Sequence, residues 1–187
     1  MARIPYPDPA ALPDTNRKLL EGLPQLNIFR MLAGAGTSFP AFMGLLNAYL
    51  NEGVLDPELR ELTILRIGHL AGSSYELHQH RRISRILGIS AARVEASAGK
   101  LPSPLFSDAE NAALAFTDDQ VAHIKADERL FAAAHEHLGD AGMQELVIVI
   151  GIYLLVCRYL ETFEIDLEDE EIPTSGLDEI RNSMGKP

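Results

Sequence analysis

The sequence has a single cysteine among its 187 residues, Cys157, so it has no Cys-x-x-Cys pair and can form no intrachain disulfide. A lone thiol inside an apolar run is typical of buried packing, and a chain without disulfides is typical of a reducing compartment. We therefore expect a cytoplasmic protein. The sequence also has no G-x-S-x-G motif and no glycine-rich phosphate loop, so the α/β-hydrolase and nucleotide-binding classes lose their usual support.

Positive charge is scarce as well. The chain carries 16 Lys and Arg residues against 27 Asp and Glu residues, which gives a net charge of −11. Such a surface repels nucleic-acid phosphates and anionic lipid head groups. The most apolar run, "LVIVIGIYLLVC", covers 146–157 and is too short to span a bilayer as a helix. We expect neither a nucleic acid nor a membrane as a partner.

The two ends of the chain differ from the rest in composition. Residues 1–12, "MARIPYPDPAAL", contain one early arginine and three prolines but no apolar core region, which predicts an extended arm rather than a signal peptide. Acidic residues gather in "EIDLEDEEIP" near the other end, and we expect a solvated acidic tail over 167–187. One helical domain over 13–166 is the expectation for the remainder, because 47% of the chain is apolar.

Apolar residues recur at helical spacing along nearly the whole chain, and no sustained alternation is bounded by hairpin turns. This pattern predicts an all-α fold. The segment "AGKLPSPLF", residues 98–106, is predicted to be a linker. Helices are predicted over these approximate ranges: 13–34 with a break near Pro24, 38–52, 57–70, 74–87, 90–96, 107–125, 128–138 and 140–163.

Two of these helices are predicted to form a hairpin. Asp56 is a predicted N-cap and Pro57 occupies the first helical position, while Gly72 is expected to end this helix. The next helix begins near Ser74, and Gly88 is expected to close it in the left-handed conformation. The polar stretch "GSSYELHQH", residues 72–80, therefore lies at the junction of a helical hairpin.

Three ionisable side chains are expected near this junction. Glu76 and His80 are four residues apart and share one face of the second helix. A carboxylate favours the imidazolium while burial opposes it, so the pair is a candidate for proton transfer near neutral pH. Glu61 lies close to the apolar stripe of the first helix, and antiparallel packing would bring it toward the hairpin. The structural alternative is that Glu76 and His80 only satisfy each other, and that Glu61 only serves helix electrostatics.

Other polar groups allow two interpretations or weaken on inspection. Arg81 and Arg82, with His78 and Arg85, form a positive patch that either binds a substrate carboxylate or is a solvated or subunit-contact face. The "HEH" of 135–137 has two histidines that point about 200° apart on a helix, unlike the one-face pair of a helical zinc site. We predict no metal.

The stretch "RELTILRIGHLAGSSYELHQH", residues 60–80, resembles the carboxymuconolactone decarboxylase superfamily, which includes the alkylhydroperoxidase D-like proteins. Weaker similarity extends from "NIFRMLA" to "GIYLLVCRYLETFEIDLE". In the peroxidase branch a glutamate is followed after eleven residues by C-x-x-C and, after three more, by a histidine. Glu61 and His80 match the glutamate and the histidine, whereas Ser73 and Glu76 stand at the cysteine positions.

The resemblance carries expectations about fold and function. It implies an all-α, alkylhydroperoxidase D-like fold built around the helical hairpin, which assembles into homotrimers or hexamers. Thiol peroxidase activity should be absent, because a hydroxyl and a carboxylate cannot act as peroxidatic thiolates. The retained residues resemble instead the non-redox members, which perform lactone and decarboxylation chemistry without a cofactor.

The leading hypothesis is a cofactor-free lyase that acts on a small organic acid or lactone by decarboxylation or a related proton transfer. His80 is the expected general acid/base, Glu76 holds and tunes it, and Glu61 is a second carboxylate of the relay. The expected substrate-binding residues are Tyr75, Ser73, and Arg81 or Arg82. A non-catalytic binding or structural member of the family is the alternative, and residual peroxidase activity is a third.

Overall fold

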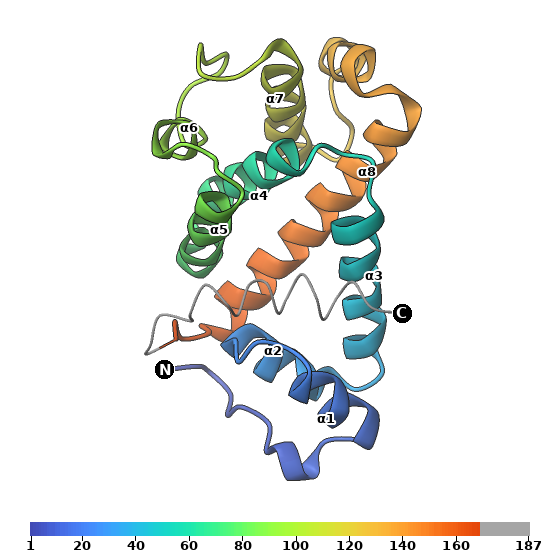
Figure 1. Ribbon diagram of the computed structural model, residues 1–187, viewed down its shortest axis with the longest axis vertical. Helices are drawn as coiled ribbons and strands as arrows, with labels where there is room; N and C mark the ends of the chain where they lie inside the picture. Colours follow the sequence, from blue (N-terminus) through green and yellow to red (C-terminus); the bar gives the residue numbers. More distant parts are fainter. Residues whose placement is uncertain (169–187) are drawn as a thin grey trace. The chain divides into compact units, whose positions relative to one another are not determined.

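A computed structural model describes residues 1–168, so nearly all of the predicted acidic tail lies outside the described residues. The described chain is helical and contains no strand, which confirms the all-α class. Figure 1 shows the helices in chain order: α1 (Asp14–Glu21), α2 (Asn27–Leu32), α3 (Ser38–Glu52), α4 (Pro57–Ala71), α5 (Ser74–Ile86), α6 (Ala91–Ala96), α7 (Asp108–Ala122) and α8 (Glu128–Phe163). Two short 3₁₀ turns are η1 (Pro9–Ala11) and η2 (Ala33–Ala35).

The helix boundaries follow the predicted signals closely. The break near Pro24 is confirmed and separates α1 from α2, and α7 ends at Ala122 rather than near residue 125. The predicted helices of 128–138 and 140–163 are the two parts of α8, which is interrupted at Gly139 with φ 63° and ψ −177°. This conformation is nearly exclusive to glycine, so a single residue redirects the helix.

The described chain divides into two compact units. The first consists of Met1–Gly53 together with the segment from Leu160 onward. Within it the N-terminal arm is bound to the segment that directly follows α8, because Arg3 pairs with Glu164 at 2.6 Å and the terminal amine pairs with Asp166 at 2.6 Å. The arm contains the turn η1 and is otherwise irregular, as expected from its prolines.

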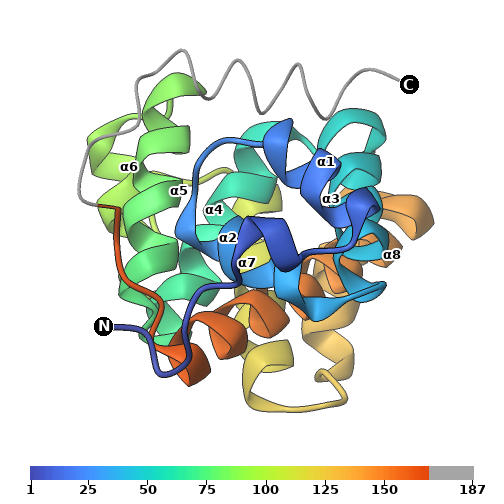
Figure 2. The same ribbon diagram turned by 90° about the horizontal axis from the view of Figure 1, so that it is seen from below.

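The second unit, Val54–Tyr159, is built on α4. Residues from Leu59 to Gly68 are all buried, since α4 packs against α5 on one side and α7 on another. Figure 2 shows α6 beside α5, and the two helices are in contact. The core of this unit is an apolar cluster from several elements: Leu62, Leu65, Ile89, Val94, Phe106 and Leu114.

A buried arginine fixes the predicted linker within this second unit. Arg66 of α4 makes a two-pronged ion pair with Asp118 of α7, with Nε–Oδ1 at 2.5 Å and Nη2–Oδ2 at 2.6 Å. Its remaining Nη1 donates to the carbonyls of Ser97 and Gly99 at 2.9 and 2.7 Å. Arg66 therefore ties α4, α7 and the start of the linker together, and its charge is fully used by these contacts.

The most apolar segment belongs to α8. By length and composition alone α8 is able to cross a membrane, because its most apolar 18-residue window has a mean hydropathy of 1.9. The same test is passed by core helices of proteins that never enter a bilayer, and 44% of this window is buried within the structure. Cys157 lies on this helix with 2% exposure, so the expected buried packing role is confirmed.

Candidate functional site

The turn between α4 and α5 brings the expected site residues together. Gly72 adopts φ 67°, the left-handed conformation that ends α4, and the N–H of Ser73 bonds to the carbonyl of Gly68 at 3.0 Å. Gly68 permits close packing of the two helices, because a Cβ at this position would lie 3.0 Å from a methyl carbon of Leu77 and 3.7 Å from Glu76. Side chains of the first turns of α5 are thereby placed against α4.

His80 lies between two carboxylates. Its Nδ1 is 2.8 Å from Oε1 of Glu61 on α4, and its Nε2 is 3.0 Å from Oε1 of Glu76, one turn earlier on α5. All three residues are buried, with exposures of 3% for Glu61, 3% for Glu76 and 9% for His80. The structure thus brings together the three residues that the sequence predicts as the catalytic set.

The two contacts of His80 differ in quality. The Nδ1–Glu61 contact is a directed hydrogen bond, whereas the Nε2–Glu76 contact has the distance of a hydrogen bond without its direction. Within residues 1–168, Oε1 of Glu76 is therefore a buried oxygen without a hydrogen-bond donor of good geometry. Glu61 orients the imidazole, and Glu76 retains accepting capacity.

The start of α5 has the sequence spacing of a capping box but does not form one. Ser73 and Glu76 have the S-x-x-E spacing of a capping box, and so do Ser107 and Glu110 at the start of α7. The second pair forms the complete box, with both reciprocal hydrogen bonds. Ser73 is the N-cap of α5 but its side chain makes no capping bond, and its fully buried Oγ has no partner among the described residues. Capping therefore does not explain why Ser73 and Glu76 stand here.

The electrostatics of the cluster fix the protonation state of His80. Burial lowers its pKa, but the charges of Glu61 and Glu76 and the hydrogen bonding to them outweigh burial and raise the pKa from 6.5 to about 10. At neutral pH the ring is consequently an imidazolium, whose two nitrogens lie 2.8 and 3.0 Å from oxygens of Glu61 and Glu76.

Two residues that sequence reasoning missed complete the surroundings of the ring. Ser84 Oγ donates to the backbone carbonyl of His80 at 2.7 Å and lies 3.4 Å from Oε1 of Glu61. Tyr153 of α8 meets the ring edge-on, with the centroids 5.2 Å apart and the planes at 88°. Ser84 follows His80 by four residues, which is a detectable signal, whereas nothing in the sequence links Tyr153 to α5.

The expected substrate-binding residues lie in different environments. Tyr75 is buried with 3% exposure on the first turn of α5. Arg81 is half-buried. The pKa of His69 on α4 is lowered first by burial and next by the charge of Arg81, so Arg81 lies near His69. Arg82 donates to Oε1 of Gln79 at 3.3 Å.

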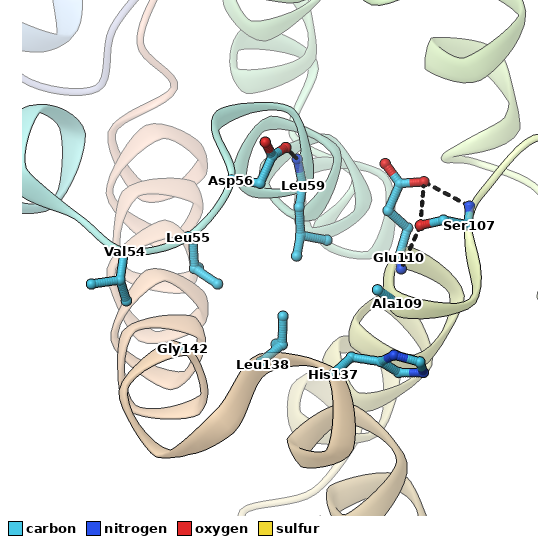
Figure 3. Close-up of a pocket in the computed structure, with 10 residues that line it drawn as sticks. All are labelled: Val54, Leu55, Asp56, Leu59, Ser107, Ala109, Glu110, His137, Leu138 and Gly142. Atoms are coloured by element: carbon cyan, nitrogen blue, oxygen red, sulfur yellow. Dashed lines mark hydrogen bonds between the residues drawn. The ribbon is translucent and has the colours of Figure 1, made fainter.

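A pocket of about 340 Å³ lies elsewhere in the second unit, where the beginnings of α4 and α7 approach the interruption of α8 (Figure 3). Three of its polar side chains are engaged in helix capping or ion pairing: Asp56 caps α4, and Glu110 accepts from Ser107 while pairing with Arg93. His137 also lines the pocket. The remaining walls are mostly apolar, including Leu55 and Leu138. Glu61, Glu76 and His80 are not among the residues that line this pocket, so it is separate from the candidate site.

In the part of the chain that the structure describes, no group of three or more His, Cys, Asp or Glu side chains is placed to hold a metal ion. His135 instead contacts Asp140 at 2.6 Å across the interruption of α8.

Comparison with known proteins finds one family match. Residues 37–119, from α3 through most of α7, match the carboxymuconolactone decarboxylase family. The matched segment contains Glu61, Ser73, Glu76 and His80. No curated protein matches the chain.

Solved structures confirm the alkylhydroperoxidase D-like fold. An uncharacterised peroxidase-related protein from Ralstonia eutropha JMP134, described as an alkylhydroperoxidase AhpD core, has a TM-score of 0.74 at 25% identity, with 90% of this chain and 93% of that chain covered. The debrominase Bmp8, as a cysteine-to-alanine variant in complex with 2,3,4-tribromopyrrole, has a TM-score of 0.67 at 24% identity, covering 87% and 86%. A protein of unknown function from Agrobacterium tumefaciens has a TM-score of 0.68 at 24% identity, covering 74% and 96%.

Proposed function

We propose that this protein is a cofactor-independent enzyme that moves a proton on a small lactone or related organic acid, in a decarboxylation or a related reaction. The observation that carries the proposal is the position of His80, held at 2.8 and 3.0 Å between two buried carboxylates. Strongly perturbed ionisable groups with a specific charge partner are typical of catalytic sites. The match of residues 37–119 to the carboxymuconolactone decarboxylase family supports the class of reaction.

The protonation state assigns the roles within the cluster. Because the pKa of His80 is raised to about 10, the ring is already protonated at neutral pH and cannot serve as the base. The base in this proposal is Glu76, whose Oε1 is buried and has no well-directed donor in residues 1–168. His80 then steadies the carboxylate and supplies positive charge as negative charge develops on the substrate, while Glu61 keeps the ring in place.

A non-catalytic role is the second candidate, and one observation favours it. The side chains of the three residues are only 4–11% exposed, so the cluster resembles a buried ion network that fixes the helical hairpin. A thiol peroxidase is not proposed, since the chain's one cysteine is at position 157, outside the hairpin. The same single cysteine supports a reducing, cytoplasmic location.

The test is turnover of a panel of γ-lactones with and without a carboxyl group, followed as loss of lactone absorbance and as exchange of ring C–H for deuterium. Glu76→Gln keeps the shape of the side chain and removes its basicity, so kcat/KM is expected to fall by roughly 10²–10⁴-fold. Glu136→Gln is the matched control, because Glu136 is an exposed glutamate of α8 outside the cluster. Unchanged turnover in Glu76→Gln would contradict the assignment, and absence of turnover in the wild type would favour the non-catalytic role.

A further inference from the structure

Arg81 is a half-buried arginine of α5 that makes no ion pair within residues 1–168. Its Nε is fully enclosed and has no hydrogen-bond acceptor there, while part of the side chain stays reachable from solvent. The chain has 27 Asp and Glu residues against 16 Lys and Arg residues, and the nearby Arg66 and Arg93 both pair with carboxylates. Arg81 is therefore a cation whose hydrogen-bonding capacity is left over.

His69, near the end of α4, has the same feature. Its Nε2 is buried and has no hydrogen-bond partner among the described residues. Burial and then the charge of Arg81 lower the pKa of His69, so the ring is neutral at neutral pH and has one N–H to donate. A buried donor that is left unpaired costs stability, and two of them on neighbouring side chains indicate a site for an acceptor.

The packing of the hairpin brings these two side chains together. Leu77 of α5 contacts α4 at Gly68, where a Cβ would lie 3.0 Å from one of its methyl carbons. His69 directly follows Gly68, and Arg81 is one turn after Leu77 on the same face. Helical side chains lean toward the N-terminus of their helix, so Arg81 leans toward the hairpin turn and His69. Leu77 also packs against the apolar cluster that includes Val94, so the pair lies on the side of the hairpin toward α6 (Figure 2).

The other charges around His69 indicate which anion suits the site. Arg66 has the smallest effect on the pKa of His69, and its own charge is paired with Asp118. Glu95, an exposed residue of α6, raises the pKa of His69 and would repel a dianion more than a monoanion. A planar carboxylate carries one charge and matches the fork of an arginine with two parallel hydrogen bonds.

We propose that Arg81 and His69 form a binding site for the carboxylate of a small organic acid. Nε and one terminal nitrogen of Arg81 donate to the two oxygens, and Nε2 of His69 donates to one of them. Arg81 directly follows His80 on α5, so the acid is held beside the turn that carries His80. In catalysis the site anchors the carboxyl group of the lactone acid from which Glu76 takes a proton, and this part of the inference rests on the proposed function.

The experiment compares three probes: a butenolide bearing a carboxymethyl group, the methyl ester of that compound, and inorganic phosphate. Affinities are measured by calorimetry, and the ring resonances of His69 are followed by NMR. The acid is expected to bind and to shift the His69 resonances, whereas the ester and phosphate should bind at least roughly 10-fold more weakly, as expected when a hydrogen bond to a charged group is lost.

Three variants locate the site. Arg81→Gln should weaken binding of the acid by roughly 10- to 100-fold. Arg85→Gln removes the same charge from an exposed position one turn later on α5, so it should change the affinity by no more than about twofold. Glu95→Gln removes the repelling carboxylate and should strengthen binding of the acid. If the acid is a substrate, Arg81→Gln should raise its KM with little change in kcat, and the KM of the ester should stay the same.

The outcomes separate this inference from the proposed function. Equal affinity for the acid and its ester, equal losses in Arg81→Gln and Arg85→Gln, or tighter binding of phosphate overturns the carboxylate site and leaves the proposed function standing. Binding of the acid that depends on Arg81, without turnover of any lactone, supports the site and overturns the enzymatic role. Absence of binding by all three probes overturns the site, and turnover of the lactone panel then decides the proposed function by itself.

Discussion

The stability of the protein should depend on the protonation of His80. The folded protein raises the pKa of this side chain from 6.5 to about 10, after burial has acted in the opposite direction. Because the folded state binds the proton more tightly than the unfolded chain, the resulting stability is fully present below pH 6.5 and is lost as the pH rises toward 10. The effect is opposite to that of a salt-bridged carboxylate, which loses stability in acid.

The expected loss is large. A pKa raised from 6.5 to about 10 corresponds, at roughly 1.4 kcal/mol per pKa unit, to a decrease on the order of 5 kcal/mol in the free energy of unfolding. Whole domains are typically stable by about 5–15 kcal/mol. Urea unfolding measured at intervals between pH 6 and pH 10 should therefore show a falling midpoint well before most lysines lose their charge.

Two variants and one direct measurement check the cause. Glu61→Gln removes one charge and replaces the charge-assisted hydrogen bond of Nδ1 by one to a neutral amide oxygen, so the protein should be less stable at pH 7 and should lose less stability between pH 7 and pH 10. Glu136→Gln, on the exposed side of α8, should follow the wild-type curve. A ring resonance of His80 that titrates near pH 6.5, or a urea midpoint that stays constant across the range, would refute the reasoning.

Two further predictions concern the framework around the site. Gly139→Ala should destabilise the protein by about 1–3 kcal/mol in urea unfolding because φ is 63° there, whereas Gly151→Ala, a helical position with open space around its Cβ, should be neutral or stabilising by up to about 1 kcal/mol. Arg66→Met should lower the free energy of unfolding by about 3–5 kcal/mol, because it leaves Asp118 and two backbone carbonyls without their hydrogen-bond donor. Asp118→Asn retains a polar partner for Arg66 and should lower the free energy of unfolding by less. Equal losses in the two variants would contradict this account.

The fold was largely predictable because its helix boundaries are set by local chemistry. Asp56 accepts from the N–H groups of Glu58 and Leu59, and Ser107 forms a complete capping box with Glu110, as their sequences indicate. Gly72 and Gly88 take the positive φ values of 67° and 81° expected at helix ends. These signals depend on neighbours within five residues, so no tertiary information is required.

The site was predictable only in part, because its properties depend on contacts between helices. The spacing of Glu76 and His80 predicts a carboxylate–imidazole pair. One carboxylate alone would leave the pKa of the buried histidine close to neutral pH. Glu61 of α4 adds the second carboxylate, and the pKa of His80 rises to about 10, so the ring is protonated at neutral pH. The structure also predicts that His80→Ala lowers the free energy of unfolding substantially, since two buried carboxylates would lose the cation between them.

The surplus carboxylate is the strongest argument that the cluster is more than a structural ion pair. One glutamate suffices to satisfy a buried histidine, and Glu61 already provides a directed hydrogen bond at 2.8 Å. Glu76 adds attraction to the ring, but it also adds a buried like charge beside Glu61 and leaves an oxygen without a good donor in residues 1–168. An apolar or amide side chain would avoid that desolvation cost. The arrangement suits a carboxylate that acts as a base, because an adjacent cation favours its ionised form and one of its oxygens keeps accepting capacity.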